Sequence, residues 1–372
     1  MSSTERPRTM AHPGSGSTRR TLLVAGAASL AVGGLAGLAL WADDETTKDA
    51  NAPAGPAIAG SFDIARPTRL WRPTALNDTT GPQSLAFDDT TGDVYVVQQA
   101  QGGLRLRGEK APVDAAERKR AGDLCVTRFS GSGEQLGRMY LRGFGHGVSM
   151  GVQAAGRTVW LWVESRARGK TAYGQAVTRV PFEDGAVLDD ADRSVRPRFL
   201  APRGSLRVHP AVDPTTGRLL VGYLDADGKA HGYSVHRLRD VLAGDETPLW
   251  RIDGAAYLEK ATFQGCTLHG DYIYQLTGNP YSKADGRNPR DSGGNTFISA
   301  LDVRTGRPAG RQLVSVDPSL RFREPEGIAV RAHPEPLLCM GFSVKTTDRR
   351  KLALYGFDPR KGGKGRKAGN AS

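Results

Sequence analysis

The chain has 372 residues, of which 38% are hydrophobic and 7% aromatic, and its formal net charge is +12. This length and composition allow one large all-β domain or two smaller domains. Four Arg and one Glu give the first 42 residues a charge of +3, and a second basic segment, rich in Gly and Lys, follows Asp358. The net charge is therefore not that of a uniformly basic domain. We expect a mildly basic folded body and a disordered basic tail over residues 359–372.

The N-terminus carries the motif of a twin-arginine export signal. Arg19 and Arg20 precede an apolar run, rich in Gly and Ala, over residues 22–41. This arrangement predicts a signal peptide over residues 1–42, a flexible linker over residues 43–61, and a secreted or cell-envelope-associated product. About twenty apolar residues can also span a bilayer, so an uncleaved membrane anchor is the alternative. Export disfavours nucleic acid as a partner.

A strand pattern recurs about every sixty residues, five times between Gln83 and the C-terminal tail. Each copy contains a small-residue apolar strand, a tight turn and a second, more hydrophobic strand. The copies are QSLAFDDTTGDVYVV from Gln83, GVSMGVQAAGRTVWLWV from Gly147, HPAVDPTTGRLLVGY from His209, QGCTLHGDYIYQL from Gln264 and EGIAVRAHPEPLLCMGF from Glu326. Repetition at this period predicts an all-β fold, a five-bladed β-propeller formed by one domain over residues 62–358.

Turn and outer-strand patterns complete the predicted blades. Asp88, Asp213 and Asp302 each begin a D-x-x-T-G sequence, in which Asp can cap the turn and Gly supplies a positive φ. The predicted outer pairs are residues 125–129 with 138–141, 176–181 with 198–200, 233–238 with 249–252, and 296–301 with 312–315. The last blade has only residues 352–357 beyond its inner pair. We therefore expect residues 68–71 to supply its outermost strand and to close the ring.

The cysteines and two of the tryptophans allow more than one interpretation. Cys125, Cys266 and Cys339 lie in predicted apolar strands, so buried free thiols are expected, although a Cys266–Cys339 disulfide stays open. Trp160 and Trp162 share one face of a strand, where they either pack between blades or form a platform for sugar stacking. We favour packing, because large aromatic side chains normally fill the space between blades.

The propeller geometry predicts where a ligand would bind. In a four-stranded blade, the innermost strand begins at one face, and the loop between the second and third strands returns to that face. The candidate ligand-binding residues at the starts of the innermost strands are Gln83, His146, Arg207, His209, Gln264, Glu324 and Glu326. A basic rim is expected from the loops, with Arg105, Arg107, Arg166, Arg168, Lys170, Arg287, Arg290 and Lys345. Amide, imidazole and guanidinium groups around a channel mouth suit an anionic ligand rich in hydroxyl groups.

Each of these residues also has a structural interpretation. Basic loops are commonly no more than solvated surface, and the glycines around His146 can reflect close packing at a strand start. Glu324 and Glu326 lie beside Arg323 and across the predicted ring from Arg207, so a structural ion pair competes with a catalytic acid. The chain has no H-E-x-x-H, G-x-S-x-G or paired C-x-x-C motif, and we expect no metal or cofactor site.

Several of these motifs together resemble a known family. The run GFGHGVSMG from Gly143, the EPEG sequence from Glu324 and the strand starts at Gln83 and Gln264 are similar to the propeller family of teichoic acid biosynthesis protein C and staphylococcal phage receptor-binding proteins. The resemblance covers about residues 62–358. It implies contact with cell-wall glycopolymers, above all wall teichoic acid. Because its phage members are binding domains, the resemblance assigns no catalytic residue to this chain.

These observations favour a carbohydrate-binding function. The leading hypothesis is an exported, monomeric propeller without a cofactor that binds an anionic, teichoic-acid-like polymer through a basic face around the channel mouth. The alternative is a glycoside or phosphodiester hydrolase at the same site, with His146 and Glu326 as its catalytic residues. A scaffold for a protein partner is a third hypothesis.

Overall fold

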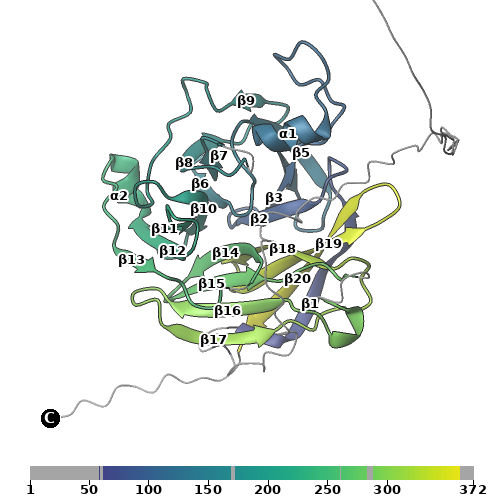
Figure 1. The fold of residues 1–372 in the computed structure, drawn as a ribbon, viewed down its shortest axis with the longest axis vertical. Helices are drawn as coiled ribbons and strands as arrows, with labels where there is room; N and C mark the ends of the chain where they lie inside the picture. Colours follow the sequence, from purple (N-terminus) through teal and green to yellow (C-terminus); the bar gives the residue numbers. More distant parts are fainter. Residues whose placement is uncertain (1–57, 59–61, 169–171, 260, 283–287, 361–372) are drawn as a thin grey trace, which may run out of the picture. The chain divides into compact units, whose positions relative to one another are not determined.

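The computed structural model describes residues 58, 62–168, 172–259, 261–282 and 288–360. Their strands form five sheets that follow one another in sequence order around a ring, as Figure 1 shows. The fold is a five-bladed β-propeller in a single domain, as the repeat predicts.

Four blades have the predicted order of strands. Blade 1 contains, from the centre outward, β2 (Pro82–Asp88), β3 (Asp93–Gln99), β4 (Leu124–Phe129) and β5 (Gln135–Arg142). Blade 3 contains β10 (Leu206–Asp213), β11 (Arg218–Leu224), β12 (His231–Arg237) and β13 (Trp250–Asp253). Blade 4 contains β14 (Phe263–His269), β15 (Tyr272–Thr277), β16 (Phe297–Asp302) and β17 (Pro308–Leu313). Blade 5 contains β18 (Glu324–Arg331), β19 (Leu337–Lys345) and β20 (Arg350–Pro359), with one further strand.

Blade 2 departs from the prediction. It contains β6 (Gly151–Ala155), β7 (Thr158–Ser165) and β8 (Ala176–Pro181). The fourth strand predicted at residues 198–200 is reduced to one bridge between Val177 and Arg198. The intervening chain crosses to the neighbouring blade, where β9 (Val187–Asp189) pairs in parallel with β5. The predicted outer pair therefore forms at only one position, because part of the connecting chain covers the edge of blade 1 instead.

The ring is closed by the strand that precedes blade 1 in the sequence. β1 (Phe62–Ala75) pairs in antiparallel with β20, which confirms the closure predicted for residues 68–71. Trp71 in this strand is only 2% exposed and also reaches blade 1. Its ring centroid lies 5.5 Å from that of Phe129, and its Nε1 donates a hydrogen bond to the Gly131 carbonyl at 2.8 Å. One side chain therefore links the closing strand to the first blade.

The D-x-x-T-G turns have the conformation that their sequence predicts. Asp88 accepts hydrogen bonds from the backbone N–H and hydroxyl of Thr90 and from the hydroxyl of Thr91. Asp213 and Asp302 accept bonds from the threonines of their own turns. The closing glycines have φ values of 75°, 61° and 69°. The same turn chemistry thus fixes two inner hairpins and one outer hairpin.

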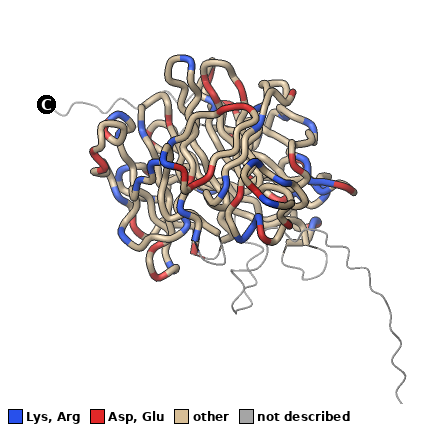
Figure 2. The backbone as a smooth tube through the Cα atoms, turned by 90° about the horizontal axis from the view of Figure 1, so that it is seen from above, with Lys and Arg blue, Asp and Glu red and all other residues tan. Residues whose placement is uncertain are grey.

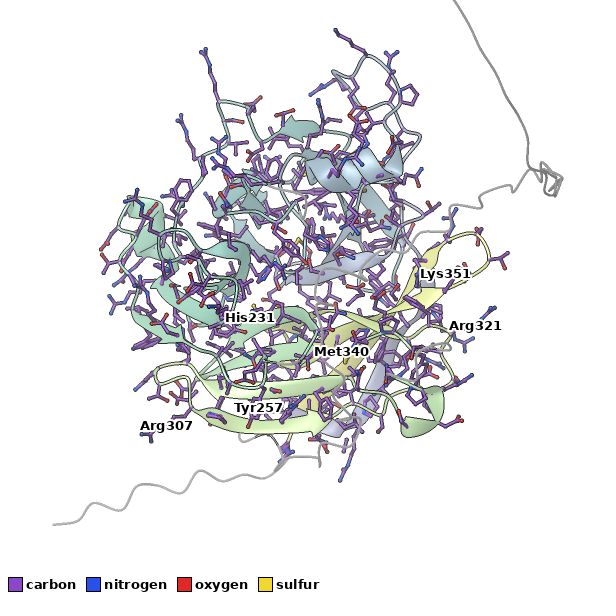
Figure 3. All side chains as sticks on the ribbon, in the orientation of Figure 1. His231, Tyr257, Arg307, Arg321, Met340 and Lys351 are labelled. Atoms are coloured by element: carbon purple, nitrogen blue, oxygen red, sulfur yellow. The ribbon has the colours of Figure 1, made fainter. Side chains whose placement is uncertain are left out.

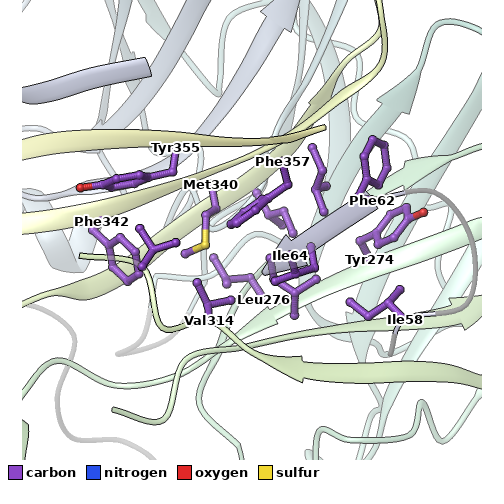
Figure 4. Close-up of a cluster of buried hydrophobic side chains, with 14 of the residues drawn as sticks. Ile58, Phe62, Ile64, Tyr274, Leu276, Val314, Met340, Phe342, Tyr355 and Phe357 are labelled. Carbon is purple, nitrogen blue, oxygen red and sulfur yellow. The ribbon is translucent and has the colours of Figure 1, made fainter. Parts of the chain in front are cut away.

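The apolar core is distributed around the ring. Figure 4 shows a cluster that joins blades 4 and 5 to the start of β1 and includes Phe62, Tyr274 and Met340. Ile58, from the segment predicted as a linker, is fully buried in the same cluster. Part of that segment therefore belongs to the folded body.

The buried aromatic and sulfur groups agree with the structural interpretations. Trp162 is fully buried with Leu200 and Val221, which confirms packing between blades for this residue. The three cysteines are buried free thiols, so the disulfide left open by the sequence does not form. Trp160 is half-buried and makes a different contact, described below.

In the described residues, the helices lie in connections between strands. α1 (Ala115–Ala121) lies between β3 and β4, and α2 (Leu238–Ala243) lies between β12 and β13. Across the described ranges, no helix has the length and apolar character needed to cross a membrane. The predicted signal peptide, most of the linker and most of the basic tail lie outside the described residues.

The long loop between β3 and β4 is held by a buried ion cluster. Arg118 in α1 donates to Glu109 and Asp123, both at 2.7 Å, and to the Leu104 carbonyl at 2.9 Å. Its side chain is only 1% exposed. Arg118 therefore orders the loop and adds no positive charge to its surface.

Replacing Trp71 with Ala should destabilise the propeller by about 3–5 kcal/mol, because it removes a buried ring and its hydrogen bond to blade 1. Urea unfolding followed by circular dichroism should give a lower midpoint for Trp71→Ala than for the wild type. Arg72→Ala changes the exposed neighbouring residue and should leave the midpoint unchanged. Equal midpoints for all three proteins would contradict the role assigned to Trp71.

Candidate ligand-binding site

We call the face at which the innermost strands begin the entrance face. Four of these strands, β2, β10, β14 and β18, have a register shift near their start. The shifts fall at Gln83, residues 207–208, Gln264 and residues 326–327, and so include four positions that the sequence singled out. A β-bulge leaves a residue unpaired and re-aims its side chain. The candidate residues are thus displaced from the regular sheets in four blades.

Close backbone contacts bring these strand starts together. A Cβ atom on Gly327 would lie 2.7 Å from the Cα of Ser84, and one on Gly265 would lie 3.6 Å from the Cα of Gly327. The hydroxyl of Ser84 also donates to the Gly147 carbonyl at 2.6 Å. The starts of β2, β14 and β18 and the segment before β6 therefore meet, and these segments carry Gln83, Gln264, Glu326 and His146.

His146 is held in place by a buried carboxylate beneath its backbone. Glu164, at 1% exposure, accepts hydrogen bonds from the N–H groups of His146 at 2.8 Å, Gly147, and Gly174 at 2.6 Å. A Cβ on Gly145 would overlap this carboxyl group. Burial raises the pKa of Glu164 to about 7, while the N–H donors oppose the shift. The glycines around His146 thus have a structural role, because they let the chain approach Glu164.

Rings from three successive blades form a row across the entrance face. His146 stacks on Tyr173 with 4.4 Å between centroids, and Tyr173 lies edge-on to His209 at 6.3 Å. Phe263 follows, 5.1 Å from His209 and 5.4 Å from His231. Figure 3 shows His231 between the strands of blades 3 and 4. We call these five residues the aromatic row.

Arg207 lies against the centre of the aromatic row. It has a φ of 54° in the bulge of β10, and its guanidinium carbon lies 4.8 Å from the centroid of Tyr173. The N–H of the next residue donates to the Gly174 carbonyl at 3.0 Å, which ties the bulge to the loop carrying Tyr173. Burial lowers the pKa of Arg207, and it lowers the pKa of His209 well below its usual value and that of His231 to about 4. Both imidazoles are therefore neutral at pH 7.

Blade 5 contributes a pair of buried carboxyl groups. Glu324 and Glu326 are 5% and 6% exposed, and their carboxyl groups are hydrogen-bonded to each other. Burial raises the pKa of Glu324 to about 7 and that of Glu326 well above its usual value, while the charge of Arg350 opposes both shifts. The acid pair therefore retains a proton at neutral pH.

The arginine that faces the acid pair differs from those suggested by the sequence. Arg323 is 1% exposed and donates to the carbonyls of Val314 and Val316 at 2.7–2.9 Å. Arg207 instead lies against Tyr173. Arg350 interacts electrostatically with both carboxyl groups and stacks on Phe322 at 3.5 Å. The structural ion pair with Arg323 or Arg207, one of the two alternatives that the sequence offered, is therefore replaced by an acid pair beside the stacked guanidinium of Arg350.

The amide groups near the strand starts bond to the backbone and to the aromatic row. Gln83 Nε2 donates to the Pro82 carbonyl, and Gln264 Nε2 donates to the Gly278 carbonyl, each at 3.0 Å. The Nε2 atom of Gln99 lies 3.2 Å from His146 Nδ1. Gln99, at the end of β3, is thus the amide that contacts the predicted histidine.

The predicted basic rim contains both free and partnered cations. Arg105, Arg107, Arg168, Arg290 and Lys345 are exposed, whereas Arg166 pairs with Asp190 at 3.4 Å. Arg290 also donates to the Pro318 carbonyl at 3.0 Å. Lys170 and Arg287 lie outside the described residues. Figure 2 shows Lys and Arg interspersed with Asp and Glu along the chain, so positive charge does not cover this view as one continuous region.

Residues 82–356 match the family described as the phage 5-bladed β-propeller receptor-binding platform domain. The chain belongs to this family. "Putative major teichoic acid biosynthesis protein C" of Bacillus subtilis strain 168 is 27% identical over 307 residues, which cover 80% of this chain and 64% of that protein. The tail fiber of Staphylococcus aureus phage P68 shares the fold, with a TM-score of 0.57 and 18% identity over 79% of this chain and 52% of that chain. The chain thus spans less than two thirds of either protein.

The described part of the chain has no group of three or more His, Cys, Asp or Glu placed to hold a metal ion. The family resemblance expected from the GFGHGVSMG and EPEG sequences is confirmed. The structure adds Tyr173, Glu164, Phe263 and Arg350 to the candidate site. Tyr173 lies in the loop between β7 and β8, which the sequence analysis singled out for its basic residues. The aromatic ring of Tyr173 was not recognised as part of the site.

The acid pair should make the stability of the platform depend on pH. Its folded pKa values lie above the ordinary value of 4.5, so the folded state holds a proton that the unfolded chain releases as the pH rises. This contribution is fully present below about pH 4.5 and is lost as the pH passes about 7. From pH 5 to pH 8, the unfolding free energy of Glu324→Gln/Glu326→Gln should therefore rise relative to that of the wild type, by about 2 kcal/mol.

Urea unfolding of both proteins at several pH values measures this difference. The control is Glu335→Gln, at an exposed position, which should keep a constant difference from the wild type. If the difference for the double variant is also constant between pH 5 and pH 8, the acid pair does not retain a proton.

Proposed function

We infer that this chain is an exported propeller that binds an anionic, teichoic-acid-like glycopolymer of the cell envelope at its entrance face. The observation that carries this inference is membership of a family described as a receptor-binding platform. The name of the Bacillus subtilis relative connects that protein with teichoic acid biosynthesis. Teichoic acids contain repeating phosphates and polyols, so their recognition requires groups for negative charge and groups for hydroxyls.

The centre of the entrance face offers both kinds of group. Arg207 is half-buried, and its guanidinium can form a charge-assisted hydrogen bond with a phosphate. His146 and Tyr173 lie beside it and are also half-buried, with ring faces and polar atoms suited to a polyol. His209 is only 2% exposed and supports the row from below. The proposed contact surface is therefore Arg207, His146 and Tyr173.

The exposed rim residues provide attraction over a longer range. Arg105, Arg107 and Lys345 are exposed, and their contacts with phosphate would be weak and sensitive to salt. A repeating polymer can engage several such contacts at once, which raises the overall affinity. The twin-arginine sequence at Arg19 and Arg20 supports export to the compartment where such a polymer is found.

The arrangement of the acids favours binding over hydrolysis. A glycosidase places two carboxyl groups about 5–10 Å apart, on opposite sides of the bond that it cleaves. Glu324 and Glu326 are directly hydrogen-bonded to each other, which leaves no room for a sugar between them. Glu164 is occupied by three backbone N–H groups. We therefore propose that the entrance face holds the polymer without cleaving it.

Binding to purified cell walls tests this function. The wild-type protein should bind walls that retain teichoic acid, and binding should fall after the acid is extracted and as the salt concentration rises. Arg207→Gln should weaken binding about tenfold, because it removes a charge-assisted contact to phosphate. Co-sedimentation over a range of protein concentrations measures both effects.

The matched control is Arg307→Gln, which removes a guanidinium from an exposed turn at the opposite end of blade 4 (Figure 3). It should bind walls as the wild type does. Equal binding to extracted and unextracted walls would rule out the proposed ligand. Equal binding by Arg207→Gln and the wild type would instead move the contact surface away from the aromatic row.

A further inference from the structure

A groove lies on the face opposite the entrance face, between blades 2 and 3. Its volume is about 540 Å³, and its walls come from β6, the β10–β11 turn, α2 and the start of β13. The residues that give it chemical character are Gln153, Arg218, Arg237, Arg239, Leu242 and Trp250. The groove thus brings guanidinium groups, an indole ring and an amide together at a place that the sequence did not single out.

The arginines give the groove an excess of positive charge. Arg237 and Arg239 have side chains that are 54% and 82% exposed, and both pair with the single carboxylate of Asp240, at 3.5 and 3.3 Å. Arg218 is buried, donates to the Thr216 hydroxyl at 2.7 Å and pairs with the carboxylate of Asp213 at 3.5 Å. Arg237 and Arg239 carry two positive charges and share the single negative charge of Asp240, while Asp213 pairs with Arg218. These four groups and Asp240 therefore leave the edge of the groove with an excess of one positive charge.

Trp250 provides an aromatic wall with two cations near its ring. Its side chain is half-buried, and the guanidinium carbons of Arg218 and Arg304 lie 5.6 and 5.7 Å from its ring. Leu242 is 39% exposed beside it in the lining. An exposed apolar edge next to an indole ring suits the C–H face of a sugar.

Gln153 forms the polar wall of the groove in a fixed orientation. Its Oε1 accepts hydrogen bonds from Trp162 Nε1 and Arg179 Nε, both at 3.0 Å. Because both bonds use the oxygen, the Nε2 group is left as the donor end of the amide. Arg179 is itself fixed by stacking 3.8 Å from the ring centroid of Trp160, which lies opposite Gln153 in the sheet. The donor is therefore positioned before any ligand binds.

We propose that this groove binds a sugar phosphate unit of an anionic glycan. The sugar ring lies against Trp250 and Leu242, the phosphate contacts Arg237 and Arg239, and Gln153 donates to a hydroxyl. A sugar phosphate should therefore bind more tightly than either of its components. A neutral sugar makes no contact with the arginines, and free phosphate makes no contact with the indole ring. The source of the glycan rests on the proposed function, but the groove itself is independent of the entrance face.

The test follows Trp250 directly in the full chain. Tryptophans are replaced with 5-fluorotryptophan, and the Trp250 fluorine signal is assigned by its loss in Trp250→Phe. Glucose 1-phosphate should shift this signal in a saturable manner, whereas glucose or inorganic phosphate at the same concentration should shift it much less. Arg237→Glu/Arg239→Glu should weaken the binding of glucose 1-phosphate at least tenfold.

Two controls distinguish binding in the groove from binding elsewhere on the protein. Arg157→Glu changes an exposed arginine in the β6–β7 turn, on the same face but outside the groove lining, and should bind as the wild type does. Arg207→Gln should also leave the Trp250 shift unchanged, so failure of the entrance face and failure of the groove give different results. No Trp250 shift with glucose 1-phosphate, or an equal shift with adenosine monophosphate, would overturn the proposal.

Discussion

The structure depends on the close approach of the innermost strands at the entrance face. Gly327 is so near Ser84 that an added Cβ would lie 2.7 Å from the Ser84 Cα, and a Cβ on Gly265 would lie 3.2 Å from the Val148 carbonyl oxygen. Four innermost strands have register shifts at this level, and their unpaired residues leave the regular pleat. The crowding that closes the centre of the ring thus also produces the irregular surface on which the candidate site is built. A single backbone constraint accounts for both.

Much of the fold could be predicted because each blade repeats the same sequence pattern of two inner strands. A small-residue strand, a tight turn and a more hydrophobic strand recur with the blade, and the missing last strand identifies the closing role of residues 68–71. Blade 2 could not be predicted in this way. Its outer chain pairs with β5 through β9, and this choice depends on an exposed sheet edge in a neighbouring blade rather than on the residues that follow β8.

The strand starts that the sequence singled out lie close together in the fold, but the contacts of their charged groups could not be predicted. Several of these contacts come from segments distant in sequence. Glu164 resembles any acid at the end of a strand until the fold brings three backbone N–H groups to it. Glu324 and Glu326 resemble partners for Arg323, but burial makes the sharing of a proton between the two carboxyl groups more favourable than separate ionisation. Such pairings follow from burial, which a single sequence does not record.

The two proposed binding regions lie at opposite ends of the blades, and this separation restricts how one polymer can use both. β10 has eight residues, so at about 3.3 Å per residue the two faces are roughly 25 Å apart. A glycan shorter than this distance can occupy only one region and gains affinity from local contacts alone. A longer chain that passes around the edge of a blade makes the second contact intramolecular, and its affinity then rises without any new kind of interaction. Because the charge at each region is modest, the geometry of the propeller favours long polymers over short fragments of the same chemistry.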